Sequence, residues 1–269
     1  MVPSDTLRLL APAAIALALL LVAGVAALVH LWRGASAFST PWKILLMRFA
    51  AVNPWRGRDL VALLALVALA QIVRTRLPVS TWREVLTFQG AVLAGGFWLA
   101  RHKSHPFGAP APLKAVATQA LLRWLAILPL LWFFAFIWQA LLTAMGHAPD
   151  LQNSIRIFIG SQNVLQRVEF LLFAVLLAPV AEEILFRGIL LPLLIRRAGA
   201  TGGLLLTAIG FAALHGDLGT FMPLAAISIA LSLAYARTGT ILVPMTMHAL
   251  FNGVNLALLW VLARAGVLT

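Results

Sequence analysis

The chain has 269 residues, of which 62% are hydrophobic and 10% are charged. A soluble domain is about 45–50% apolar and about 25% charged, so this composition indicates a protein that lies in a membrane. The absence of cysteine excludes disulfides, thiolate metal sites and a cysteine nucleophile. The formal net charge of +12 does not indicate nucleic-acid binding, because the basic residues lie between apolar spans, where they orient the chain in the membrane.

Long apolar runs predict the fold. Runs of about 20 apolar residues cross a bilayer as helices, and they predict an all-α polytopic membrane bundle of about eight transmembrane helices. In chain order we expect spans at residues 9–32, 59–73, 82–100, 115–145, 168–196, 202–215, 220–236 and 240–263. Pro129 is expected to kink the fourth span.

The segments between these spans indicate how the chain is placed. Residues 41–52 are amphipathic enough to lie along the membrane surface, and residues 147–166 are expected to form a polar connector outside the membrane. The loops on one side carry more basic residues than those on the other, so the positive-inside rule favours both termini outside. We expect one integral membrane domain, with an N-terminal helical region over residues 1–160 and a C-terminal membrane core over residues 161–269.

Two adjacent carboxylates and an arginine lie inside the apolar span 168–196. They are Glu182, Glu183 and Arg187. A charged side chain at the bilayer centre costs about 2.5–3.5 kcal/mol on insertion scales, so it is rare there without a partner or a function. Glu183 and Arg187 share one helix face and can pair, whereas Glu182 points about 100° away. Glu182 would therefore be available for chemistry; the alternative is one structural charge network formed by all three.

Two later spans carry polar groups at the same four-residue spacing. Phe211 and His215 end one span, and His248 and Asn252 lie inside the last. Taken singly, His215 could cap its helix, and His248 and Asn252 could tie helices together by hydrogen bonds. Taken with the carboxylate pair, they supply a base, a second base or orienting group, and donors for an oxyanion. Those are the groups that water needs to attack an amide.

These motifs resemble those of the CPBP family, the CAAX proteases and bacteriocin-processing enzymes also called the Abi family, which are related to the Ras-converting type of CAAX prenyl protease. The family pattern is Glu-Glu-x-x-x-Arg, then Phe-x-x-x-His, then His-x-x-x-Asn or Asp. All three motifs occur here, in that order, and the resemblance covers about residues 168–263. It implies an eight-helix membrane fold with a polar cavity. It also implies an intramembrane endopeptidase, a peptide hydrolase that cleaves membrane-associated or lipidated proteins or peptides.

The resemblance also implies roles for single residues. Glu182 and His215 would activate water, His248 and Asn252 would stabilise the oxyanion, and the structural support would come from Glu183, Arg187 and Phe211. It implies no cofactor.

Zinc held by Glu182, His215 and His248 is an alternative, although the chain has no His-Glu-x-x-His motif. A non-catalytic scaffold or bacteriocin-immunity protein of the same fold is another. A proton-coupled transporter is a third, but no inverted repeat is visible. The expected partners are the bilayer and a membrane-anchored or lipidated substrate. The expected location is a prokaryotic plasma (inner) membrane, because the sequence shows no eukaryotic targeting tail.

Overall fold

A computed structural model of the chain describes residues 4–33, 40–76, 83–147, 153–161 and 163–266. Within these ranges the regular structure is helical, and the β pairing is limited to an isolated bridge between Gly108 and Thr240. The fold is therefore the predicted all-α bundle. Four described helices are long and apolar enough to cross a membrane: Ala11–Arg33, Leu113–Ala144, Phe221–Thr238 and Leu242–Arg264.

The helices of the first half agree with the expected spans, with one addition. They are α1 (Ser4–Arg33), α2 (Trp42–Val52), α3 (Gly57–Arg74), α4 (Arg83–Ala100), α5 (Leu113–Ala144) and α6 (Asn153–Gly160). Trp82, at the expected start of the third span, lies outside the described residues. The polar connector expected at residues 147–166 contains α6, and its residues 148–152 and 162 lie outside the described residues. Phe158 of this helix is buried against Phe170 and Leu256. The sequence around these residues does not predict that they pack together.

The second half begins with one long helical run. Its parts are α7 (Val164–Leu172), the π-helix η2 (Phe173–Leu177), α8 (Ala178–Glu183), the π-helix η3 (Ile184–Leu190) and α9 (Leu191–Leu214). Gly199 has a φ of +73°, which bends α9 back on itself and separates the expected spans five and six. Helices α10 (Phe221–Thr238) and α11 (Leu242–Arg264) follow.

Two prolines explain where the long run widens into π-helix. Each π segment ends two residues before a proline, Pro179 after η2 and Pro192 after η3. A proline has no N–H, and its ring collides with the carbonyl four residues earlier. Widening the turn before the proline relieves that collision. The six residues of α8, which include both glutamates, are thus placed between two π segments.

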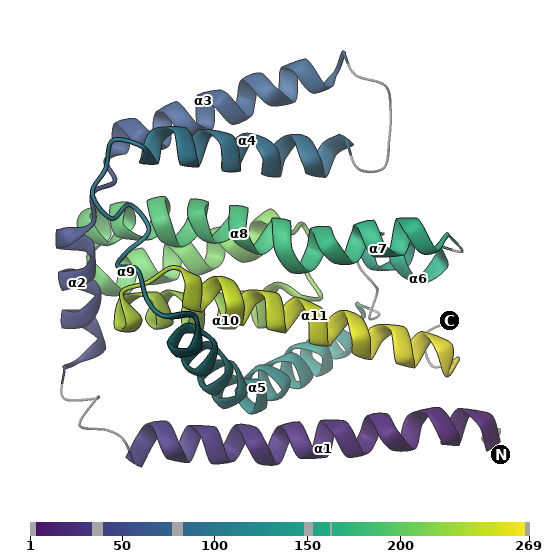
Figure 1. Ribbon diagram of the computed structural model, residues 1–269. Helices are drawn as coiled ribbons and strands as arrows, with labels where there is room; N and C mark the ends of the chain where they lie inside the picture. Colours follow the sequence, from purple (N-terminus) through teal and green to yellow (C-terminus); the bar gives the residue numbers. More distant parts are fainter. Residues whose placement is uncertain (1–3, 34–39, 77–82, 148–152, 162, 267–269) are drawn as a thin grey trace.

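The long helices surround the α7–η3 run (Figure 1). The pair α3 and α4 covers one side, and α4 contacts α8 and η3. On the other side α5 bends near its middle, where Pro129 lies, and α1 packs against it (Figure 1). Helix α2 lies crosswise at one end of the bundle, as expected of a surface segment, and its Leu46 and Ala50 are buried against α9. The start of α1 and the end of α11 lie at the same end, as eight spans require (Figure 1).

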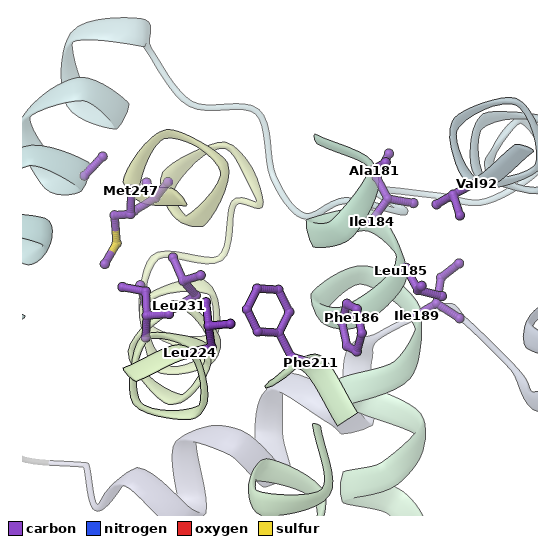
Figure 2. Packing of buried hydrophobic residues seen from close by; sticks show 14 of the residues in the cluster. Val92, Ala181, Ile184, Leu185, Phe186, Ile189, Phe211, Leu224, Leu231 and Met247 are labelled. Atoms are coloured by element: carbon purple, nitrogen blue, oxygen red, sulfur yellow. The ribbon is translucent and has the colours of Figure 1, made fainter. Parts of the chain in front are cut away.

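The main apolar core lies around the α8–η3 segment. Figure 2 shows Phe211 of α9 between Phe186 of η3 on one side and Leu224 and Leu231 of α10 on the other. Phe211 is fully buried, and its ring meets that of Phe186 edge to face with centroids 5.2 Å apart. This core fixes α8, α9, α10 and α11 against one another and so determines which polar side chains of these helices meet.

Candidate active site

The paired carboxylates of α8 take different partners. Glu183 is fully buried, and its Oε1 atom accepts a hydrogen bond from Nη1 of Arg187 at 2.8 Å. The ion pair predicted from the four-residue spacing is therefore present. Glu182 is 9% exposed and turns away from Arg187, as its offset of one residue requires. The two neighbouring carboxylates thus lie in different environments.

Arg187 of η3 contacts residues of both α9 and α10. Its Nη2 atom donates to the carbonyl oxygen of Ser228 at 3.1 Å and to the Ser228 hydroxyl at 2.9 Å. Its guanidinium lies over the ring of Phe211, 4.6 Å from the centroid. A buried charge needs partners because leaving water is costly; both terminal nitrogens of Arg187 have them, whereas its buried Nε atom has no hydrogen-bond partner among the described residues. Ser228 on α10 was not predicted, and the only sequence signal is its four-residue spacing from Ser232, which is also buried.

His248 joins α11 to the same carboxylate. Its Nδ1 atom lies 2.9 Å from Glu183 Oε1. An ionised carboxylate can only accept, so we assign the proton to Nδ1, and the ring then presents Nε2 toward Glu182. The distance from Nε2 to Glu182 Oε2 is 3.8 Å. Glu183 therefore orients His248 as well as pairing with Arg187, a role that the sequence analysis did not assign to it.

His215 approaches Glu182 from the end of α9. Its Nδ1 atom lies 2.8 Å from the carbonyl oxygen of Phe211. A carbonyl oxygen accepts, so Nδ1 again carries the proton and Nε2 is the free nitrogen of a neutral ring. That Nε2 atom is 4.0 Å from Glu182 Oε2. The backbone carbonyl that sets the tautomer of His215 could come from any residue at position 211; the Phe211 side chain contacts the His215 ring, with the two centroids 4.9 Å apart.

Glu182 Oε2 is the point on which these groups converge. It is buried and makes no hydrogen bond within the described part of the chain. The two separations, 3.8 Å and 4.0 Å, are too long for direct hydrogen bonds. Polar groups so spaced are commonly bridged by one water molecule. The arrangement can therefore hold a water molecule between a carboxylate and two imidazole nitrogens.

Asn252 lies one helical turn beyond His248 and reaches the π-helix η2. Its Nδ2 atom donates to the carbonyl oxygen of Ala174 at 2.8 Å. In η2 each N–H bonds five residues back, as Ala178 does to Phe173. The next residue, Pro179, has no N–H, so the Ala174 carbonyl has no backbone donor in this pattern. Asn252 supplies that donor and keeps its second amide hydrogen for another acceptor.

The described helices thus bring six of the seven predicted site residues into contact with one another, whereas Asn252 lies one turn further along α11 and contacts η2. The segment that carries them, residues 163–254, matches the model of a family described as Rce1-like, type II CAAX prenyl endopeptidase Rce1-like. Over this segment the chain is similar to the CAAX-protease family. The match covers the helices from α7 to α11 and not the first half of the chain. No curated protein and no solved structure matches the chain in the same comparisons.

One residue near Glu182 comes from outside the segment that the family model matches. Gln89 of α4 is 6% exposed, and its Nε2 atom donates to Glu182 Oε1 at 3.4 Å. The sequence did not reveal Gln89 because it stands in its apolar span without a polar residue four positions away, whereas Asn252 is marked by its four-residue spacing from His248. The position of Gln89 in the middle of the third span was the available signal.

A zinc site was the alternative use of Glu182, His215 and His248. Among the described residues no group of three or more His, Asp or Glu side chains is arranged to hold a metal ion. Tetrahedral zinc with bonds of about 2.0–2.2 Å would bring its ligand atoms to about 3.3 Å from one another. Both measured separations from Glu182 Oε2 are longer than that. These three side chains would have to move inward to bind zinc.

Proposed function

We propose that this chain is a member of the CAAX-protease family, an intramembrane endopeptidase that hydrolyses a peptide bond of a membrane-associated or lipidated protein or peptide. The observation that carries the proposal is the convergence of His215 Nε2 and His248 Nε2 on the unpartnered Oε2 atom of Glu182. Water attack on an amide needs a base beside the water and donors beside the carbonyl oxygen. Glu182 and His215 are the proposed base and second acceptor, and His248 and Asn252, one turn apart on α11, are the proposed donors.

In the proposed reaction a water molecule bound at Glu182 Oε2 attacks the carbonyl carbon. The water gives one proton to Glu182, with His215 Nε2 as the second acceptor, and its oxygen forms the new C–O bond. The carbonyl π electrons move to oxygen. Collapse of this intermediate restores the C=O bond and breaks the C–N bond, and the departing nitrogen takes the proton from Glu182. The products are a carboxylic acid and an amine; the acid then loses its proton to His215 Nε2 and from there to solvent, so no co-reactant besides water is needed.

His248 and Asn252 are the proposed donors for the oxyanion. His248 in its protonated form holds Glu183 through Nδ1–H and offers Nε2–H on the side of Glu182. Asn252 uses one amide hydrogen for Ala174 and offers the other. Donors fixed before the reaction stabilise developing charge without having to reorganise, and losing one such donor typically costs about 10²–10³ in rate.

The proposed substrates follow from the surroundings of the site. The name of the matched family refers to prenylated substrates with a CAAX tail. For this chain we propose a wider class, peptides that reach the helices from the bilayer, whether by a lipid or by their own apolar segment. The chain is an integral membrane protein by its apolar helices and by its similarity to this family, and we propose a prokaryotic plasma membrane as its location. The proposed chemistry uses no metal.

Comparative proteomics of membranes tests this function. Membranes from cells with the wild-type chain are compared with membranes from cells carrying Glu182→Ala. The proposal predicts at least one membrane peptide or protein that accumulates uncut with Glu182→Ala although that variant is present at the wild-type level. Identical peptide profiles, together with an unchanged cellular phenotype, would favour the non-catalytic scaffold or immunity protein.

A further inference from the structure

The amide of Gln89 on α4 contacts the carboxylate to which the proposed function gives the role of base. This helix lies in the half of the chain that the family model does not match. One face of α4 packs against the α8–η3 segment. The residues on this face are Gln89, Val92 and Gly96, which follow the three- and four-residue spacing of a helix face. Figure 2 shows Val92 directed toward Ala181 and Ile184 of the α8–η3 segment. The face is therefore built to bring α4 close to the paired glutamates.

Gly96 allows the close approach. A Cβ atom at this position would lie 2.8 Å from Cγ2 of Ile184, which is shorter than a normal contact. Val92 is buried in the same interface, 1% exposed. Two turns from Gly96, this packing leaves Gln89 with its Nε2 atom 3.4 Å from Glu182 Oε1. Small residues commonly let membrane helices approach in this way.

The hydrogen bond from Gln89 gives the two carboxylate oxygens of Glu182 different surroundings. Oε1 accepts from Gln89, and Oε2 faces His215 and His248. A carboxylate with one oxygen held cannot rotate freely, so the other oxygen stays directed at the proposed water position. Glu183 and Arg187 are the remaining charged groups near Glu182, and they are paired with each other.

The buried amide of Gln89 lowers the stability of the fold through its oxygen atom. Gln89 Oε1 is buried and makes no hydrogen bond to any described residue. A buried acceptor without a donor costs free energy that an apolar side chain of the same shape would not cost. A residue kept only for packing would be leucine or methionine at this place. An amide that donates to Glu182 while leaving its own oxygen unpartnered is typical of a functional position.

We propose that Gln89 is a positioning residue that holds Glu182 Oε1 and thereby directs Oε2 at the attacking water. This inference rests on the proposed role of Glu182. It predicts that Gln89→Leu lowers kcat by about tenfold, equivalent to about 1.4 kcal/mol, and changes KM less than about twofold. The thermal midpoint of unfolding should change little, because the substitution removes one unpartnered buried acceptor and at the same time leaves Glu182 Oε1 without its donor.

The test uses full-length protein in proteoliposomes and two readouts. The first is turnover of an internally quenched peptide with a farnesylated cysteine near its C-terminus. The second is the infrared carboxyl bands of Glu182, assigned by their loss in Glu182→Gln, and it needs no substrate. Gln119→Leu on α5 is the matched control, since Gln119 is half-buried and accepts from Arg123 instead.

The inference expects the Glu182 bands to shift in Gln89→Leu and to stay unchanged in Gln119→Leu. Unshifted bands in Gln89→Leu overturn it, and so does a loss of kcat that comes with a matching fall in the thermal midpoint, which marks a structural residue. A different result would contradict the proposed function, namely wild-type turnover by the Glu182→Gln variant. The infrared result decides about Gln89 even if the farnesylated peptide is not cleaved.

Discussion

His248 Nδ1 lies 2.9 Å from Glu183 Oε1, the same oxygen atom that accepts from Arg187. The second carboxylate of the pair therefore connects a buried cation to the histidine that faces the first carboxylate. Carboxylate–histidine contacts of this kind set the tautomer and the direction of the ring. Glu183 thus belongs to the support of the chemistry although it does not touch the proposed water.

Glu183→Gln should reduce activity through His248. The neutral amide keeps the size of the side chain but removes the charge that both Arg187 and His248 Nδ1 contact. We expect kcat to fall by about 10²-fold or more, comparable to the loss of a donor that stabilises the oxyanion. The measurement is kcat and KM on the farnesylated quenched peptide. Wild-type kcat in a folded Glu183→Gln protein would show that the contact with His248 has no part in turnover.

Arg187→Met should be strongly destabilising. It leaves Glu183 fully buried without its cation, and breaking a buried pair by removing one partner costs about 3–5 kcal/mol. Arg264→Met is the control, because Arg264 is exposed near the end of α11 and its loss should change the unfolding free energy by less than about 0.5 kcal/mol. Chemical unfolding in micelles measures both. Equal stability of the two variants would contradict the structural role of Arg187.

Pro179→Ala should disturb Asn252 without weakening the fold. The new backbone N–H at position 179 can bond to the carbonyl of Ala174 and so compete with the Asn252 amide. We expect a loss of about tenfold in kcat, or about 1.4 kcal/mol, with unchanged or higher stability, because proline is unfavourable inside a helix. Pro192→Ala is the matched control, since it follows η3 at the same spacing. The same kcat in both variants would contradict the link between Pro179 and Asn252.

Removal of metal ions should leave the activity intact. The proposed chemistry assigns the water to Glu182 and His215 alone, and zinc at Glu182, His215 and His248 would need shorter separations than those present. Activity is measured after prolonged dialysis against EDTA and 1,10-phenanthroline. Activity that is lost on chelation and returns with zinc would replace this mechanism with the zinc-dependent alternative.

The sequence predicted contacts within one helix better than contacts between helices. The Glu183–Arg187 pair follows from a spacing of four residues, and so does the placement of His215 one turn after Phe211. The contact of His248 with Glu183 spans 65 positions and depends on how α11 packs against α8. A single sequence does not contain that packing. The same limit applies to Asn252 and Ala174, which lie 78 positions apart.

Two neutral polar residues, Ser228 and Gln89, were not predicted, for a different reason. Both lie in apolar spans, and neither side chain carries a charge whose burial would be costly. Gln89 also has no polar residue four positions away, unlike Asn252. Ser228 accepts from Arg187, and Gln89 contacts Glu182. Helix α6 was missed because only a short apolar patch around Phe158 marks it. The class of fold, in contrast, follows from hydropathy alone, because the bilayer sets the length of each helix; the described residues hold four helices that are long and apolar enough to cross it.

The most direct test of the central claim is the kcat of Glu182→Gln in proteoliposomes on the farnesylated quenched peptide, or on the native substrate once proteomics identifies it. Glu169→Gln makes the same chemical change at an exposed position of α7. The account predicts that Glu182→Gln remains folded and loses about 10²–10⁴-fold in kcat, the usual contribution of a general base, whereas Glu169→Gln keeps wild-type kcat. Wild-type turnover by folded Glu182→Gln would contradict it.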